Sequence, residues 1–363
     1  MSQKLALIAA GGTGGHMFPA EALSRTLIAR GWRVVLASDS RGDLYAQNFP
    51  CEERLSLEAA TFKKGDLIGA ATAAFRIVAG ILQAMRVLDR LKPAVVVGFG
   101  GYPAFPALAA ARLKGVPIII HEQNAVLGRV NRAMAGGAAV VACAFPTLKR
   151  ASDKVSQRLA VVGNPVRSDI VALQARDYAP PDPTIRLLVT GGSQGARLLS
   201  DVIPRAIAEL PEEMRLLLRV EQQTRPESMD AARQTYAEAG VESEIAPFFR
   251  NMAARLEKAH LVIGRAGAST ISELAVAGLP SILVPLKIAM EDHQTWNAKL
   301  LEDAGAAYVI PEDAFSPDSL RAALITLISE PGGLARRAAA ARSVSIPDSA
   351  EKLADLVESV ARV

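Results

Sequence analysis

The residues Gly11-Gly12-Thr13-Gly14-Gly15-His16 combine a glycine-rich turn with an imidazole. The apolar run 4–9 enters this loop as a predicted strand, and residues 18–23 leave it as a predicted helix. Bare N–H groups at a helix N-terminus suit a phosphate group. His16 is predicted at or just before this terminus, where the helix dipole disfavours imidazolium. A neutral His16 is therefore a candidate general base, with a capping or structural role as the alternative.

This loop does not complete a dinucleotide fingerprint. The pattern G-x-G-x-x-G requires glycine where Met17 stands, although Asp39 follows the second predicted strand as a ribose-binding acid would. The sequence has no P-loop signature and no D-x-D motif, and its histidines and cysteines lack metal-ligand spacing. We therefore expect neither a nicotinamide cofactor nor a bound metal, and a plain tight turn remains an alternative.

A second strand–turn–helix pattern covers residues 261–273. The helix is predicted to start at Ser269 or Thr270, and its free N–H groups would stabilise a departing diphosphate. Glu273 has two interpretations. It can complete a capping box with Thr270, or it can accept hydrogen bonds from ribose hydroxyl groups.

A polar cluster at residues 291–297 opens another predicted helix. Gln294 and Asn297 carry amide groups that can bond sugar hydroxyls. The alternative is a solvated helix start with Asp292 as its cap.

Short apolar strands alternate with helices throughout the chain, which predicts parallel, doubly wound α/β sheets. In the first half the strands are expected at 33–37, 94–98, 117–120 and 138–142. In the second half they are expected at 185–190, 215–220, 242–246, 260–264, 281–284 and 307–310. Ligands of such sheets bind beyond the carboxyl ends of the strands. The segments 11–16, 98–102 and 121–124 all follow strands and should converge there.

Length and composition place further bounds. A chain of 363 residues predicts two domains, and a second glycine loop, Gly191-Gly192-Ser193-Gln194-Gly195, opens the second half. The net charge of +4 is too small to indicate nucleic-acid binding. Two cysteines indicate a reducing compartment, and no signal peptide is visible. Glycines and prolines interrupt the uncharged span 93–111, so we expect a cytoplasmic protein that does not span a membrane.

The predicted helix 71–91 carries an apolar stripe beside basic residues that include Lys63, Lys64, Arg76 and Arg86. The stripe can simply face the core. Alternatively, its part around Phe75 and Ile81 contacts an anionic membrane surface.

Several motifs together resemble the MurG-type family, the N-acetylglucosaminyltransferases that convert lipid I to lipid II in peptidoglycan synthesis. They span nearly the whole chain in the family's order, and their combination is highly specific. The matching segments are 11–16, 121–124, 163–167, 191–197, 265–268, 272–273, 277–280 and 292–294.

The resemblance implies the GT-B arrangement, in which two Rossmann-like domains face a cleft. The expected acceptor domain is 1–163, with the helix at about 347–363 packed back on it, and the expected donor domain is 164–346. The implied reaction is inverting, needs no metal or cofactor, and uses UDP-N-acetylglucosamine and lipid I. Members of the family act at the cytoplasmic face of the inner membrane, with other cell-wall synthesis proteins as possible partners. Their reaction contributes to cell shape and cell division. No nucleic-acid partner is expected.

The resemblance also implies roles for individual residues. Glu273 would hold the ribose, the 268–272 turn and Ser193 the diphosphate, and Gln294 the sugar. The implied donor contacts are Thr13, Gly14, Gly15, Asn124, Arg167, Ser193, Phe249, Ala268, Ser269, Thr270, Ile271, Ser272, Glu273 and Gln294. The implied acceptor contacts are Gly12, Gly101, Tyr102 and Glu122, with His16 as the candidate base.

The sequence departs from the family pattern at three places. The second glycine loop of the first half reads Gly101-Tyr102-Pro103-Ala104-Phe105-Pro106 instead of Gly-Tyr-x-Ser-Gly-Pro. Ala266 replaces a serine, and Gln222-Gln223-Thr224 replaces a Gln-x-Gly. A non-hydrolysing UDP-sugar epimerase and a non-catalytic UDP-sugar-binding protein are the alternative functions.

Overall fold

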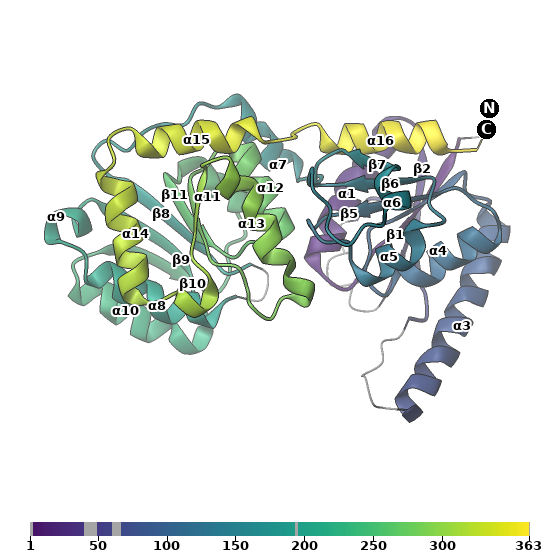
Figure 1. Cartoon of the computed structure of the whole chain (residues 1–363), viewed down its shortest axis with the longest axis horizontal. Coiled ribbons are helices and arrows are strands. Elements are labelled where there is room, and N and C mark those ends of the chain that lie inside the picture. Colours follow the sequence, from purple (N-terminus) through teal and green to yellow (C-terminus); the bar gives the residue numbers. More distant parts are fainter. Residues whose placement is uncertain (1–2, 40–48, 60–66, 193–194, 363) are drawn as a thin grey trace. The chain divides into compact units, whose positions relative to one another are not determined.

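The computed structural model describes residues 3–39, 49–59, 67–192 and 195–362, which belong to two compact units (Figure 1). Unit 1 comprises Met1–Arg167 and Pro347–Val363, and unit 2 comprises Ser168–Ile346. The boundary falls slightly later than the expected 163/164. Asn164 and Val166 are buried, and the Arg167 guanidinium lies 5.7 Å from the centroid of the Phe18 ring, so this segment packs with unit 1.

Unit 1 is built on a seven-stranded parallel sheet in the order β3-β2-β1-β4-β5-β6-β7. Its strands are β1 (Leu5–Ala9), β2 (Arg33–Ser38), β3 (Glu53–Ser56), β4 (Val95–Gly98), β5 (Ile118–Glu122), β6 (Val140–Cys143) and β7 (Leu159–Val161). The strand order reverses between β1 and β4, where Ala9 pairs with Gly98. The loops that follow these two strands therefore start side by side at the topological switch point, where ligands bind in such sheets.

The strands β3 and β7 were not predicted. Both lie at the edges of the sheet and are short, and their residues are only partly buried or exposed. An edge strand needs no continuous apolar run, so the pattern that identifies central strands is missing there.

The two faces of this sheet are covered by different helices. These are α1 (Gly14–Ala29), α3 (Leu67–Leu91), α4 (Ala104–Leu113), α5 (Arg129–Ala135), α6 (Asp153–Ser156) and α16 (Ser349–Val360). Leu5 and Leu7 of β1 pack in one core with residues of α3 and α4. Ile8, whose side chain points to the opposite face, packs in the other core with residues of α1 and α16.

The C-terminal helix α16 belongs to unit 1 although the whole of unit 2 precedes it in sequence. Leu353 and Val357 are fully buried in the core that they share with α1. Arg30, the C-cap residue of α1, forms ion pairs with Asp355, at 2.6 Å, and with Glu358, at 3.1 Å. The chain thus crosses between the units twice.

Unit 2 has a six-stranded parallel sheet in the order β10-β9-β8-β11-β12-β13. Its strands are β8 (Ile185–Thr190), β9 (Leu218–Gln223), β10 (Glu242–Ala246), β11 (Leu261–Gly264), β12 (Ser281–Leu283) and β13 (Ala307–Val309). The order reverses between β8 and β11, where Thr190 pairs with Gly264. The loops after Thr190 and Gly264 therefore lie at the switch point of this second sheet.

Helices flank this sheet as the alternating pattern predicts. They are α7 (Ser168–Val171), α8 (Arg197–Ala208), α9 (Glu212–Arg215), α10 (Met229–Glu238), α11 (Met252–Lys258), α12 (Ala268–Ala277), α13 (His293–Asp303), α14 (Pro317–Ser329) and α15 (Gly333–Ser343). Short 3-10 helices are η1 (Ala172–Ala175), η2 (Pro226–Ser228), η3 (Met290–Asp292) and η4 (Glu312–Ala314). Among the described helices of both units, none is long and apolar enough to cross a membrane.

Candidate active site

The first glycine loop joins β1 to α1 in unit 1. Thr13 is the N-cap of α1, and the helix begins at Gly14. The backbone N–H of Gly12, whose φ of +84° suits glycine, donates to Asp39 Oδ1 at 3.2 Å. Asp39 thus helps to shape the loop. This role differs from the ribose binding that its position after the second predicted strand suggested. The N–H groups of Gly14 and Gly15 have no intrahelical acceptor at this terminus, as phosphate binding requires.

His16 lies within the first turn of α1 rather than at or before the helix start, because the helix begins two residues earlier than His16. Its side chain is half-buried, and its Nδ1 lies 3.0 Å from Gln123 Oε1. A Cβ atom placed on Gly101 would lie 3.4 Å from His16 Cδ2. The loops after β1, β4 and β5 therefore meet around this imidazole, as the expected convergence of strand ends requires.

Gly101 and Tyr102 belong to the loop between β4 and α4. Gly101 has a φ of +75°, and a Cβ atom on it would lie 3.0 Å from the carbonyl oxygen of Gly11. This close approach explains the glycine, and it brings the two glycine loops of unit 1 together. Tyr102 is half-buried in the same loop.

His121 and Glu122 are the last residues of β5, whereas the sequence suggested that they belong to the loop beyond it. The His121 ring is fully buried, and its Nε2 lies 2.9 Å from the carbonyl oxygen of Gly163. Burial lowers the pKa of His121 to about 4, so this imidazole is neutral at physiological pH.

Glu122 was expected to contact the acceptor, but its carboxylate is buried and committed to the protein. One oxygen accepts from the backbone N–H of Asn124 at 3.0 Å, and the other accepts from Gly128 N at 2.9 Å and Asn131 Nδ2 at 2.8 Å. The residue is only 2% exposed. Glu122 therefore shapes the loop that presents the half-buried Asn124 and does not itself face a ligand in this structure.

The glycine loop that starts at Gly191 follows β8 in unit 2. A Cβ atom on Gly191 would collide with the backbone nitrogen of Ala196, so only glycine fits. Ser193, the expected diphosphate contact in this loop, lies outside the described residues.

Gln223, which belongs to a departure from the family pattern, fixes this loop from the end of β9. Its Oε1 accepts from Gly191 N at 3.1 Å, and its Nε2 donates to the Gly192 carbonyl at 3.0 Å. The side chain is buried. The sequence did not reveal this role, because residues 222–224 stand out there only as the replacement of a Gln-x-Gly motif. A glutamine at a strand end beside a glycine loop can nevertheless bond both a backbone N–H and a backbone carbonyl of that loop.

The loop after β11 leads into α12, whose N-cap is Gly267. The helix therefore begins at Ala268, earlier than predicted, and Thr270 lies in its first turn. This position rules out the capping box of Thr270 with Glu273, since a capping-box threonine must be the N-cap itself. Glu273 is half-buried in the second turn of the helix.

Two serines of this turn differ in their bonding. Ser272 Oγ donates to the Ala268 carbonyl at 3.0 Å. Ser269 Oγ is buried and has no hydrogen-bond partner among the described residues. Together with the first N–H groups of α12, Ser269 can donate to an anionic ligand.

Polar side chains from α13 hold this turn in place. Asp292 occupies the N-cap position of α13, but its side chain makes no capping hydrogen bond and instead accepts from Thr295 Oγ1 at 2.7 Å. The Oε1 of Gln294 accepts from Ala266 N at 3.2 Å and from Leu286 N at 3.0 Å, which leaves its NH2 group to donate to a sugar. Asn297 was considered a sugar contact, but it is fully buried and donates to the Ala266 carbonyl at 3.1 Å. Asn297 therefore positions the loop.

The side chains of Arg265 and Phe249 mainly contact other groups of the protein. Arg265 donates to the Val284 carbonyl at 3.0 Å and forms an ion pair with Glu312 at 2.5 Å. Phe249, an expected donor contact, is buried, and the Arg255 guanidinium lies 3.8 Å from its ring centroid. The Phe249 ring is therefore covered by Arg255 in this structure.

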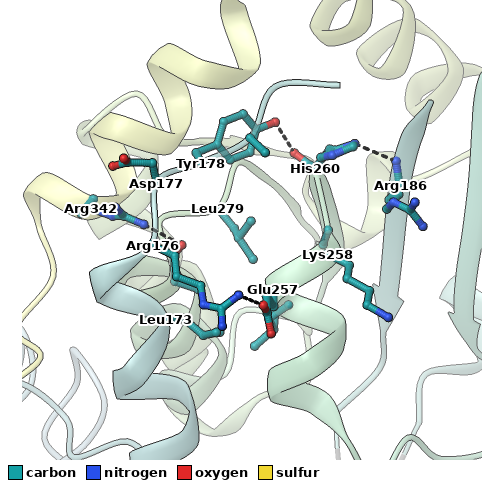
Figure 2. A pocket seen from close by; sticks show the side chains of 14 residues that line it. Leu173, Arg176, Asp177, Tyr178, Arg186, Glu257, Lys258, His260, Leu279 and Arg342 are labelled. Atoms are coloured by element: carbon teal, nitrogen blue, oxygen red, sulfur yellow. Dashed lines mark hydrogen bonds and ion pairs between the residues drawn. The ribbon is translucent and has the colours of Figure 1, made fainter. Parts of the chain in front are cut away.

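Unit 2 also has a cavity of about 430 Å³, whose lining side chains are drawn in Figure 2. Its lining includes Arg186 near the start of β8 and His260 just before β11, both at the amino ends of strands. His260 Nδ1 accepts from Arg186 N at 3.1 Å, and Tyr178 donates to the His260 carbonyl at 2.9 Å. The cavity therefore lies at the wrong edge of the sheet for the candidate site.

No group of three or more His, Cys, Asp or Glu side chains in the described ranges is placed to hold a metal ion. Each unit instead offers a glycine loop and a helix N-terminus at its switch point. An imidazole is present in unit 1, and a carboxylate and an amide are present in unit 2. The groups of unit 1 suit a phosphate and a hydroxyl group that is deprotonated. The groups of unit 2 suit a diphosphate, a ribose and a sugar.

The chain belongs to glycosyltransferase family 28. Residues 6–143 match the N-terminal domain of this family, and residues 186–357 match its C-terminal domain. The expected α/β fold with two parallel-sheet domains is thereby confirmed.

Individual relatives are similar over the full length. The UDP-N-acetylglucosamine--N-acetylmuramyl-(pentapeptide) pyrophosphoryl-undecaprenol N-acetylglucosamine transferase of Caulobacter vibrioides is 60% identical, with 99% of each chain covered. The protein of the same name from Phenylobacterium zucineum is 57% identical, again over 99% of each. The crystal structure of Acinetobacter baumannii MurG has 33% identity and a TM-score of 0.81, covering 98% of this chain and 99% of that one.

Proposed function

We propose that this protein transfers N-acetylglucosamine from UDP-N-acetylglucosamine to the 4-hydroxyl group of the muramyl sugar of lipid I, forming lipid II with inversion at the anomeric carbon. The observation that carries this proposal is the 60% identity, over 99% of both chains, to a transferase named for that reaction. An epimerase or a non-catalytic binding protein of the same fold is not favoured, because relatives at 57–60% identity carry the transferase name.

In this proposal the donor binds chiefly at the switch point of unit 2. The N-terminal turn of α12 would bind the diphosphate, Glu273 the ribose and the Gln294 amide the sugar. Phe249 is buried beneath Arg255, so it would support the donor site and not contact the donor through its ring. Further donor contacts from unit 1 would be Thr13, Gly14, Gly15, Asn124 and Arg167.

The reaction is a direct displacement. The muramyl 4-oxygen bonds to the anomeric carbon while the bond from that carbon to the UDP oxygen breaks, and the hydroxyl proton passes to His16. Negative charge develops on the leaving diphosphate, where the N–H groups of α12 and Ser269 Oγ would stabilise it. The acceptor diphosphate would bind near Gly12 and the Gly101–Tyr102 loop.

An assay with labelled UDP-N-acetylglucosamine and a lipid I analogue tests the reaction. We expect labelled lipid II and UDP to form in equal amounts, and no change in the donor when the acceptor is omitted. Conversion of the donor without acceptor would indicate an epimerase, and donor binding without transfer would indicate a binding protein. Either result would overturn the proposed reaction.

We expect Glu273→Gln to raise the KM for the donor by about 10- to 100-fold while kcat changes little, because a hydrogen bond to a charged group contributes roughly 1.5–3 kcal/mol. The variant keeps the size of the side chain and removes its charge. Steady-state kinetics with the donor varied would measure the effect. Glu302→Gln, at an exposed position on α13, is the matched control. An unchanged donor KM in Glu273→Gln would exclude the ribose contact.

We further propose that unit 1 contacts an anionic membrane surface through α3, on the cytoplasmic side where UDP-sugars occur. Phe75 is 76% exposed, and Val78 and Leu82 are also exposed on the same face. Ile81, expected beside Phe75 in this contact, packs instead against the core, together with Met85. Lys63 and Lys64 lie outside the described residues, whereas Arg76 and Arg86 are exposed on the helix.

Membrane binding should fall when this apolar face becomes acidic. We expect the double change Phe75→Asp and Val78→Asp to lower partitioning to vesicles of phosphatidylglycerol and phosphatidylethanolamine by about 10-fold or more, since burying one such side chain contributes roughly 1.5–3 kcal/mol. Leu216→Asp, at an exposed leucine of unit 2, should leave partitioning unchanged. Equal partitioning of all three proteins in a flotation assay would contradict the proposed contact.

A further inference from the structure

A chain of hydrogen bonds leads from the half-buried His16 into the interior of unit 1. His16 Nδ1 lies 3.0 Å from Gln123 Oε1, and Gln123 Nε2 lies 3.0 Å from His121 Nδ1. His121 Nε2 lies 2.9 Å from the Gly163 carbonyl oxygen. Gln123 and His121 are both buried, so water does not compete for the bonds between them or for the bond to Gly163. The donor and acceptor roles along these hydrogen bonds decide which ring nitrogen of neutral His16 carries the proton.

Two backbone carbonyl groups determine these roles, because a carbonyl oxygen only accepts. Gln123 Nε2 donates to the carbonyl of His121 at 3.0 Å, which fixes the orientation of the Gln123 amide. The Gly163 carbonyl requires that His121 carry its proton on Nε2. His121 Nδ1 of this neutral ring is then an acceptor, and it receives the second N–H of the Gln123 amide. The bonds from Gln123 to His121 and from His121 to Gly163 are therefore donated in the same direction, towards the Gly163 carbonyl.

The amide orientation leaves Gln123 Oε1 facing His16. An amide oxygen cannot donate, so His16 Nδ1 must carry a proton and the lone pair of the neutral ring must lie on Nε2. In the described part of the chain, His16 Nε2 has no hydrogen-bond partner. Free histidine in water prefers the opposite tautomer, with its proton on Nε2, so the protein imposes this state.

We infer that Gln123 is a positioning residue that holds His16 in the Nδ1–H tautomer and thereby leaves Nε2 to accept the proton of the acceptor hydroxyl. Only the second part of this inference, that Nε2 accepts the proton of the acceptor hydroxyl, rests on the proposed function. The tautomer itself follows from the hydrogen bonds. In serine-protease triads the loss of the correct histidine tautomer lowers kcat by about 10⁴-fold. Gln123 is neutral and stabilises no imidazolium charge, so a smaller effect is expected here.

The direct test is the tautomer of His16 in the free protein. Two-bond ¹H–¹⁵N correlation spectra of protein with ¹⁵N-labelled histidine, recorded at pH 8, distinguish the two neutral tautomers. The chain has only four histidines, and His16→Ala identifies the His16 signals by their loss. We expect protonated Nδ1 at His16 and protonated Nε2 at His121. A His16 signal from the Nε2–H tautomer would overturn the inference, and this test needs no variant of Gln123.

Gln123→Met tests the role of the amide. The variant keeps the length of the side chain and removes both hydrogen-bonding groups. We expect His16 to shift towards the Nε2–H tautomer and kcat to fall by about 10- to 100-fold, with the donor KM within about twofold of the wild-type value. Gln157→Met, at an exposed glutamine of unit 1, should change neither quantity. An unchanged tautomer in folded Gln123→Met would overturn the inference.

The outcomes separate the inference from the proposed function. If His16→Ala retained normal turnover, the assignment of His16 as the base would fail, and the wild-type tautomer would still decide the role of Gln123. If the protein transferred no sugar at all, the proposed function would fail while the spectra remained interpretable. A Gln123→Met variant with a shifted tautomer and wild-type kcat would show that the tautomer does not serve catalysis, which overturns the functional half of the inference.

Discussion

His16→Ala is expected to lower kcat by about 10²- to 10⁴-fold at saturating donor and acceptor, the usual contribution of a positioned general base. The imidazole is half-buried in the first turn of α1, where three loops of unit 1 meet. The substitution removes the proposed proton acceptor and leaves the backbone N–H groups of the loop in place. The donor KM should therefore change much less than kcat.

Rapid-quench or steady-state assays with both substrates saturating would measure this loss. His260→Ala is the matched control, because His260 lies at the amino ends of the unit 2 strands, away from the switch point. That control should retain wild-type turnover even if its thermal stability falls. Near-normal kcat in His16→Ala would remove His16 from the mechanism and direct attention to other groups of the acceptor loops.

The stability of unit 1 should fall as the pH drops from about 6.5 to 4 because of His121. The folded state holds the pKa of His121 at about 4, whereas the ordinary value is 6.5, so the unfolded chain binds the proton first. The stabilisation is complete above pH 6.5 and is lost as the pH falls through this window. Complete loss corresponds to roughly 3 kcal/mol of unfolding free energy, of which about 2 kcal/mol is lost by pH 5.

Urea unfolding at pH 7.5 and pH 5 would measure this dependence. Trp32 is buried in unit 1, so its fluorescence in a Trp296→Phe background reports unit 1 alone. His121→Gln, which keeps a donor for the Gly163 carbonyl, should be less stable at pH 7.5 and should lose about 2 kcal/mol less than wild type on going to pH 5. Repeating the comparison in a His16→Ala background removes any contribution of the neighbouring His16 to both profiles. Parallel pH profiles for the wild-type protein and the His121→Gln variant would contradict the prediction.

The elements around the candidate site were largely predictable from local sequence. The glycine loops after β1 and β8 follow apolar strands, and the predicted strands 185–190 and 242–246 have the observed bounds. Boundaries were less predictable where two signals competed. Thr270 and Glu273 fit a capping box in sequence, yet Gly267 caps α12 because the turn after β11 is shorter than expected. The apolar stripe of α3 could not reveal that Phe75 is exposed while Ile81 packs on the core.

The roles of the polar side chains were much less predictable. In the sequence Gln123 stands out only as part of the segment 121–124, and its contact with His16 joins residues that are 107 positions apart in the chain. Asn297 and Glu122 carry groups that suit ligands, but these groups bond to partners inside the protein instead. A buried polar group must find a partner, and only the fold determines which groups are buried together.

The sequence by itself determined the two α/β halves, the glycine loops at their strand ends, the placement of His16 beside one of them and the resemblance to a glycosyltransferase family. These properties depend on local periodicity, on glycine at tight turns and on the order of short motifs. The tertiary structure decided the strand order that places each loop at a switch point, and the hydrogen bonds that orient His16. Such contacts join distant segments, and burial rather than residue type makes them obligatory.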